Sequence, residues 1–380
     1  MTTAIIPAAG MASPSPGDVI SYDGQAGRLF RLGFKVAALT LITLGIYRFW
    51  GKTEIRRYLW SRLRLAADRL EYTGTGKELF IGFLIVLAVL IPYGILSQTL
   101  VIFSVVWSPL AQGAVSVAQA VFILFLFGYA IYRARRYRLS RTLLRGIRFG
   151  QMGSAARYGM MFLGYILLTV VTLGIAKPVG DVALYRFQTR NSLFGDQPFD
   201  FEGRGREMMG RWIVCLILIP FTLGLSLLWY AAFKMRYFAG GTRFGDVTFA
   251  LPVKLWDLIR VYFPYLLVML LVFGIFTGVI FAPIFSAFYQ AAAVGQAPPL
   301  IETTTNILIF AVFFVLFGIL APVFHLVLVT HRFLRLVVER LDISGAADFE
   351  SIIQGAAQKA GVAEGLADAI DVGGGVEVGF

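Results

Sequence analysis

The chain has 380 residues, of which 58% are hydrophobic and only 15% are charged, and its mean hydropathy is +0.75. Because soluble domains carry about 25% charged residues, this composition excludes a soluble or disordered protein and indicates a polytopic membrane protein. The one cysteine, Cys215, cannot form an internal disulfide, and its apolar neighbours in the sequence predict a small buried side chain. The 34 basic and 22 acidic residues give a net charge of +12.

The charges are distributed unevenly along the chain. From Asp342 onward there are seven acidic residues and one basic residue, Lys359, a net charge of −6, so the preceding part carries +18. A basic excess in short loops between apolar stretches is typical of cytoplasmic loops, and we therefore expect no nucleic-acid partner. Three regions are predicted: a flexible N-terminal tail at 1–27 without a secretory signal, a membrane domain at 28–340, and an acidic, glycine-rich cytoplasmic tail at 341–380.

Seven stretches are apolar enough, at about 20 residues each, to cross a bilayer as helices. The first includes Arg31, Lys35 and Arg48, so it crosses only if these side chains reach toward the two interfaces. The predicted fold class is an all-α polytopic membrane protein with about seven transmembrane helices. The predicted spans lie at about 29–50, 79–103, 115–132, 158–176, 212–233, 261–285 and 307–330.

Two pairs of these stretches predict helical hairpins, 79–103 with 115–132 and 261–285 with 307–330. Their connecting loops carry only Glu302, whereas the segment that follows Tyr132 carries seven arginines and no acidic residue up to Arg148. Because basic loops stay in the cytoplasm, the hairpin tips are expected to face away from it, and the C-terminus is expected to be cytoplasmic.

The first, fourth and fifth stretches have basic residues at both ends, which leaves two topologies. Seven full crossings would place the N-terminus outside, but they would also place the charge-mixed loop at 177–211 outside. Alternatively, some of these stretches are re-entrant or bent at a Thr-Leu-Gly sequence, which keeps every basic loop inside but requires protein to cover the bend. We prefer seven crossings; both topologies leave the C-terminus in the cytoplasm.

An internal repeat runs through the chain. Thr-Leu-Gly occurs at 43–45, 172–174 and 222–224, within or at the end of apolar stretches. An Arg-aromatic pair recurs at 57–58, 136–137, 186–187, 236–237 and 332–333. The first four pairs precede turn-rich segments, such as those around Gly195-Asp196 and Gly245-Asp246, which predict short β-like hairpins between some of the spans. An aromatic-x-Gly step at 22–24, 72–74 and 201–203 comes before an apolar stretch. Such a degenerate repeat predicts that one structural unit builds the membrane domain.

Several of these motifs are similar to those of a known family. The sequences TLGIYRFW at 43–50, RRY at 56–58 and YTGTGKELF at 72–80 resemble the YjgN-like family of bacterial inner-membrane proteins, as do RLSRT at 138–142, RGIRF at 145–149 and EGLADA at 364–369. The resemblance covers nearly the whole chain. It implies a multi-pass protein of the bacterial inner (cytoplasmic) membrane. The family is known as a domain of unknown function, so the resemblance assigns no catalytic residues.

The inventory of chemically active residues is small. The only histidines, His325 and His331, are six residues apart and do not share a helix face, so no metal site is predicted, nor a cofactor or an enzymatic activity. The cores of the last six stretches contain no charged residue, which argues against an ion-coupled transporter. His325 is nevertheless a candidate intramembrane polar site, and the alternative is a neutral histidine hydrogen-bonded near the interface.

The arginines of the repeat suggest contact with lipid phosphates. A guanidinium donates two parallel hydrogen bonds to phosphate, and aromatic rings prefer the headgroup level. The most plausible function is therefore a non-enzymatic, lipid-interacting or envelope-organising protein whose partners are anionic membrane lipids, and the alternative is a channel or transporter for a small solute. A lateral groove beside the arginines would favour the first function, and a polar cavity reaching the midplane the second. The candidate lipid-phosphate contacts are Arg57, Arg136, Arg141, Arg145, Arg236 and Arg332.

Overall fold

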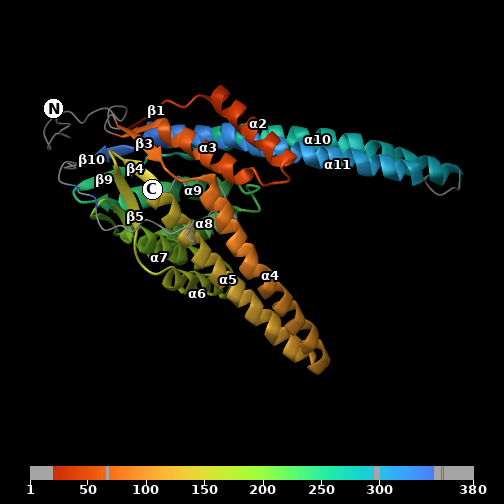
Figure 1. Ribbon diagram of the computed structural model, residues 1–380, viewed down its shortest axis with the longest axis horizontal. Coiled ribbons are helices and arrows are strands. Elements are labelled where there is room, and N and C mark those ends of the chain that lie inside the picture. The colour runs from red at the N-terminus through yellow and green to blue at the C-terminus, as the bar shows by residue number, and fades with distance from the viewer. Residues whose placement is uncertain (1–19, 66–67, 295–299, 346–351, 353, 355–380) are drawn as a thin grey trace.

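The computed structural model describes residues 20–65, 68–294, 300–345, 352 and 354. Short strands gather at one end of the molecule, and two long helical hairpins extend away from it (Figure 1). The strands form one antiparallel sheet in which each strand pairs with the next one in the sequence. In order they are β1 (Ile20–Tyr22), β2 (Leu63–Leu65), β3 (Asp68–Tyr72), β4 (Thr142–Leu144), β5 (Ile147–Gln151), β6 (Ser192–Phe194), β7 (Gln197–Phe201), β8 (Thr242–Phe244), β9 (Val247–Ala250) and β10 (Asp342–Ser344).

Within the described chain, five helical hairpins each lie between two strands. The first helix of a hairpin packs on the second helix of the preceding one, and α2 packs on α11, so these contacts close a ring. The first four hairpins are α2 (Ala26–Ile42) with α3 (Arg48–Ser61), α4 (Gly76–Trp107) with α5 (Pro109–Ser140), α6 (Ala155–Val171) with α7 (Lys177–Arg190), and α8 (Gly205–Leu218) with α9 (Leu225–Gly241). The fifth is α10 (Leu255–Val294) with α11 (Leu300–Phe324). Helix α11 continues as the π-helix η1 (His325–Thr330) and then as α12 (His331–Arg340).

The sheet is strongly curved. Neighbouring strands lie about 4.8 Å apart, so a flat sheet would separate β1 from β10 by about 43 Å. Instead α12, which leads directly into β10, packs against β1, and the Tyr22 hydroxyl lies 2.9 Å from Nδ1 of His331. Side chains from several strands, among them Leu144, Phe194 and Phe244, form one buried cluster. The predicted β-like hairpins are thus parts of one sheet, which corrects the all-α fold class.

Four of the predicted spans correspond to long apolar helices. Among the described residues, the helical segments Gly76–Val105, Pro109–Ser140, Leu255–Gly278 and Ala311–Arg340 are long and apolar enough to cross a membrane. They overlap the predictions at 79–103, 115–132, 261–285 and 307–330, so the chain is a helical polytopic membrane protein. The count of seven spans is not confirmed.

The other three predicted spans contain a reversal of the chain. These are the predictions at 29–50, 158–176 and 212–233. In the first, α2 ends at Ile42 and a short turn leads into α3. In the same way α6 ends at Val171 before α7, and α8 ends at Leu218 before α9. Each turn contains Thr-Leu-Gly, with leucine and glycine in the left-handed region at φ values of 49° to 51° and 86° to 92°. The backbone therefore has the bend of the alternative topology.

The threonine of each turn replaces the hydrogen bonds that the helix loses there. Thr43 Oγ1 donates to the Leu39 carbonyl at 2.7 Å and accepts from the Tyr47 N–H at 2.9 Å, while the Gly45 N–H donates to the Thr40 carbonyl at 2.7 Å. Thr172 and Thr222 make the same pair of bonds. These bonds satisfy several of the backbone polar groups that lose their helical partners at the turn.

The predicted tails take part in the fold near the membrane domain. Residues 1–19 of the predicted N-terminal tail, 1–27, lie outside the described residues. The rest of this tail includes β1 and the start of α2. The C-terminal tail, 341–380, begins with β10, and beyond residue 345 only Ile352 and Gln354 are described.

Candidate functional site

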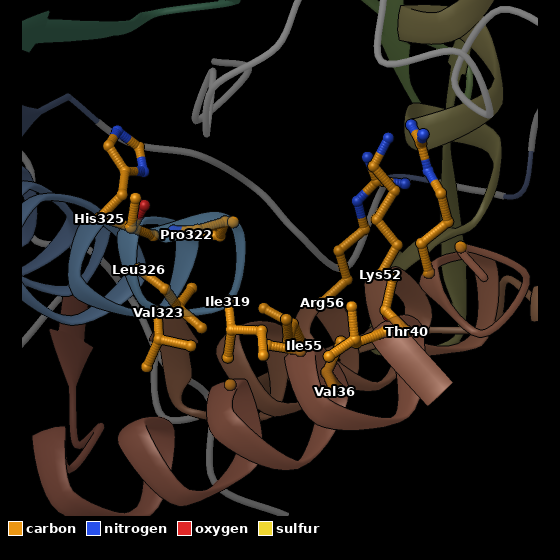
Figure 2. Close-up of a pocket in the computed structure, with 18 of the residues that line it drawn as sticks. Val36, Thr40, Lys52, Ile55, Arg56, Ile319, Pro322, Val323, His325 and Leu326 are labelled. Atoms are coloured by element: carbon orange, nitrogen blue, oxygen red, sulfur yellow. The ribbon is translucent and has the colours of Figure 1, made fainter. Parts of the chain in front are cut away.

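A cavity of 1080 Å³, here called the α2–α11 cavity, lies between α2, α3 and α11. Its apolar wall includes Val36, Ile55, Ile319, Val323 and Leu326. In Figure 2 the Lys52 and Arg56 side chains stand at one side of this wall and His325 at the other. The cavity thus joins an apolar surface to a polar one, as a site for an amphipathic molecule would.

Two glycines allow the helices around the cavity to approach closely. A Cβ atom at Gly33 of α2 would lie 3.0 Å from Leu326, and one at Gly51 of α3 would lie 2.1 Å from Val36. Small residues at such positions let helix backbones meet in an apolar environment. The position of α2 between α3 and α11, and with it the shape of the cavity, depends on these two residues.

The basic rim of the cavity consists of Arg48, Lys52, Arg56 and Arg138. The first three follow one face of α3 at intervals of four residues, and like charges at this spacing destabilise a helix. None of the described acidic residues lines the cavity. Arg56 Nη1 donates to the Tyr72 hydroxyl at 3.3 Å, and a guanidinium has further N–H groups that can donate to an anion.

The other Thr-Leu-Gly hairpins do not share this basic stripe. In α3, Arg48 and Lys52 come three and seven residues after the turn glycine. The equivalent positions are Lys177 and Asp181 in α7, and Leu227 and Ala231 in α9. Asp181 Oδ2 lies 2.7 Å from Lys177 Nζ on α7 and 2.8 Å from Lys234 Nζ on α9, so one carboxylate pairs with a lysine from each of these two hairpins. The basic stripe is therefore not a requirement for building such a hairpin.

The cavity opens toward an apolar surface. Leu44, at the α2–α3 turn, lines it and is 93% exposed, and Phe314 of α11 also lines it and is exposed. Both lie on elements whose outward side chains are aliphatic or aromatic, and large exposed patches of this kind mark membrane or protein contacts. The cavity therefore borders an exposed apolar surface.

The structure gives two of the predicted lipid contacts an internal role. Arg57 Nη2 donates to the Gly74 carbonyl at 2.7 Å, and Arg136 donates to the Gly153 carbonyl seventeen residues further on. Arg186 makes the equivalent bond to Gly203. These guanidinium groups hold the loop before the next helix in three successive units.

The remaining predicted arginines are spread over the molecule. Arg141 pairs with Glu78 at 3.1 Å, Arg145 forms an ion pair with Asp68, and Arg236 and Arg332 are exposed. None of the six predicted arginines lines the α2–α11 cavity, but His325 does. Its ring packs edge-on against Tyr265 of α10, with the ring centres 5.5 Å apart.

The sequence-based prediction missed the basic rim, although a signal was present. Basic residues at 48, 52 and 56 recur at the spacing that places side chains on one face of a helix. Cys215, predicted to be buried, is fully buried in α8. In the described part of the chain, no three His, Cys, Asp or Glu side chains group as metal ligands would.

Comparison with known proteins gives related sequences. The chain matches the family model described as bacterial protein of unknown function (DUF898) over residues 18–220 and 199–359. The inner membrane protein YjgN of Salmonella typhimurium (strain LT2) is 25% identical over 280 residues, which cover 73% of this chain and 62% of that protein. The inner membrane protein YjgN of Escherichia coli O157:H7 is 24% identical over 160 residues, 42% of this chain and 37% of that protein.

The alignments span less than two thirds of either relative, and no solved structure matches the chain. The family match, in contrast, extends over most of the chain and includes every motif that resembles the YjgN-like family except EGLADA at 364–369. The resemblance found in the sequence is thereby confirmed, and the chain belongs to DUF898, a family of bacterial proteins of unknown function.

Proposed function

We propose that this protein is a non-enzymatic, lipid-binding protein of the bacterial inner membrane, and that the α2–α11 cavity holds an anionic lipid. The basic rim would bind the headgroup phosphate, and the apolar wall would contact an acyl chain. The observation that carries the proposal is the combination of these two surfaces in one cavity that borders exposed apolar side chains. The names of the two relatives support the location.

The proposal includes a topology. The α4–α5 and α10–α11 hairpins cross the bilayer, while the three Thr-Leu-Gly hairpins enter it from the cytoplasmic side and return. In support, the turn leucines Leu44, Leu173 and Leu223 are 93%, 89% and 95% exposed, as expected of side chains that insert among lipids. The sheet and both ends of the described chain would then lie in the cytoplasm, and the five hairpins would be copies of the repeat seen in the sequence.

This topology places the basic rim near the headgroups. Arg48 and Arg56 are eight residues apart, about 12 Å along a helix, with Arg48 nearer the inserted turn and Arg56 nearer the cytoplasmic sheet. A long basic side chain can extend toward the interface while its carbon stem stays in apolar surroundings. A lipid in the cavity would therefore meet cations at the depth of its phosphate and apolar side chains below.

The transport alternative receives less support from the cavity. A transport path for a small polar solute would need polar groups along its length, whereas the residues of α2 and α11 that line the cavity are apolar apart from Thr40. His325, the candidate intramembrane site, lies at one side of this wall rather than in a polar path (Figure 2).

Native mass spectrometry of the purified protein tests the proposal by counting retained anionic lipids. Each basic residue near an anionic surface contributes about 1 kcal/mol, so a Lys52→Gln/Arg56→Gln double variant should bind such a lipid about 30-fold more weakly. The matched control is Arg236→Gln/Arg332→Gln, which removes the same charge away from the cavity. Unchanged retention in the cavity variant, or equal loss in both variants, would refute lipid binding in the cavity.

A further inference from the structure

The basic rim of the α2–α11 cavity extends over about two turns of α3. Arg48 is the first residue of this helix, Lys52 lies one turn further on, and Arg56 lies one turn beyond Lys52. At a rise of 1.5 Å per residue, Arg48 and Arg56 are about 12 Å apart along the helix axis. The rim is therefore long compared with a single phosphate group.

Aromatic rings accompany the two outer guanidinium groups of this stripe. The Arg48 guanidinium lies over the Phe49 ring, 5.6 Å from its centre, and Phe49 is buried. The Arg56 guanidinium lies 5.8 Å from the centre of the Tyr72 ring, whose hydroxyl it also contacts. Because Tyr72 ends β3, this contact directs Arg56 toward the sheet, away from Arg48. The rim therefore has two separate ends.

The Arg48 end is also the N-terminus of a helix. Gly45 of the Thr-Leu-Gly turn lines the cavity beside Arg48, and α3 has no acidic residue in its first turn. The N-terminus of a helix carries a partial positive charge, so a cation there is unfavourable and an anion is favourable. An anion at this end would interact with both the guanidinium and the helix dipole.

The Arg56 end is completed by a second helix. Trp60, one turn after Arg56, lines the cavity, and its Nε1 donates to Thr142 Oγ1 at 3.0 Å. The Thr142 hydroxyl donates in turn to the carbonyl of Arg138, on α5, at 2.9 Å. These bonds hold the end of α5 beside the end of α3, so Arg138 and Arg56 form the second cationic end of the rim.

The acidic residue of α3 is engaged elsewhere. Glu54 is the only acidic residue in this helix; its carboxylate lies 3.0 Å from Lys35 Nζ and accepts the Tyr47 hydroxyl at 2.7 Å. It does not line the cavity. The described lining of the cavity thus has four cations, two at its ends and two that extend them, and no carboxylate.

We propose that the lipid bound in the α2–α11 cavity carries two phosphate groups, one at the Arg48 end of the rim and one at the Arg56 end. This inference rests on the proposed function and names the class of its ligand. Lys52 lies between the two ends, within one turn of each. A lipid with one phosphate uses the Arg56 end alone, so Arg48 is the residue that selects two phosphates over one.

Native mass spectrometry with defined lipids tests the inference on the parent protein. Cardiolipin and phosphatidylglycerol with the same acyl chains are the probes, since they carry two phosphates and one phosphate on glycerol headgroups. Each additional cation that a lipid engages should strengthen binding about fivefold, and the helix N-terminus adds to this, so cardiolipin should bind about tenfold more tightly. Equal binding of the two lipids would overturn the inference.

The Arg48→Gln variant tests where the second phosphate binds. It should bind phosphatidylglycerol as the parent does, while its preference for cardiolipin falls about fivefold. The matched control Arg236→Gln, away from the cavity, should keep the full preference. A preference that persists in Arg48→Gln, or that falls equally in the control, would overturn the inference. If Arg48→Gln does not fold, as checked by size-exclusion chromatography, Arg48→Lys replaces it; this variant keeps the charge but loses the paired N–H donors, so its preference should also fall.

Failure of the inference is distinguishable from failure of the proposed function. If Lys52→Gln/Arg56→Gln weakens phosphatidylglycerol binding but the parent has no preference for cardiolipin, the lipid site stands and the two-phosphate ligand is refuted. If the double variant changes the binding of neither lipid, the lipid site itself is refuted, and the inference with it.

Discussion

The internal role of the repeated arginines predicts what a charge-preserving substitution will do. Arg136, on α5, donates to the Gly153 carbonyl, and its guanidinium lies over the Tyr132 ring, 5.5 Å from the ring centre. In Arg136→Lys the positive charge remains, but an ammonium on a shorter, non-planar group does not reproduce this geometry. We expect the variant to insert normally and to be less stable.

The structure sets the size of the effect. A hydrogen bond from a charged donor contributes about 1.5 to 3 kcal/mol, and a guanidinium over an aromatic ring contributes about 0.5 to 1 kcal/mol at a partly exposed site. Because the ammonium retains part of both interactions, we expect Arg136→Lys to lose about 2 kcal/mol of stability. Arg57→Lys and Arg186→Lys should lose similar amounts, since each removes the same type of bond to Gly74 or Gly203.

Thermal unfolding in detergent, followed together with lipid retention in native mass spectrometry, measures this prediction. The account expects a lower unfolding temperature and the same number of bound lipids as in the parent. Lipid loss without a change in the unfolding temperature would show that Arg136 binds phosphate, as the sequence suggested, and would refute the internal role.

Three other substitutions test the hairpins. Gly51→Ala should lower the free energy of unfolding by about 2 kcal/mol, because the new Cβ would lie 2.1 Å from Val36. The control Gly27→Ala, which has no atom within 4 Å of its new Cβ, should not destabilise the protein. Thermal unfolding of the two variants tests this difference. A fluorophore at Leu223→Cys should be quenched by lipids that carry a quencher on the acyl chain, and an unquenched probe would argue against insertion of the turn.

The long spans were predictable because composition decides them. The region from Leu79 to Tyr132 has no charged side chain, and a stretch of this length has few structures open to it other than a membrane hairpin. The Thr-Leu-Gly bends were only the second of two topologies considered, since threonine and leucine also occur inside helices and only the glycine hints at a reversal. Leu44 at φ 51° is an unfavourable backbone state that no sequence pattern indicates.

The sheet and the cavity depend on contacts that sequence patterns do not show. The strands have three to five residues, and Leu70 of β3 pairs with Leu144 of β4 across a complete helical hairpin. Likewise, the basic stripe on α3 was visible as a helix face, but its facing wall comes from α11, more than 250 residues later in the chain. The Arg-aromatic pairs were recognised, but the glycine carbonyl that each arginine binds was not.

The topology is the central claim, because the lipid site requires the Thr-Leu-Gly hairpins to enter and leave the membrane on one side. It is tested most directly by labelling single cysteines in intact cells with a membrane-impermeant maleimide; the native Cys215 is buried and serves as the unlabelled background. We expect Gln112→Cys, at the tip of the α4–α5 hairpin, to be labelled, and Asp196→Cys, between β6 and β7, to be labelled only after the cells are permeabilised. Labelling of Asp196→Cys in intact cells would place residues 177–211 outside, as seven crossings require, and would contradict the account.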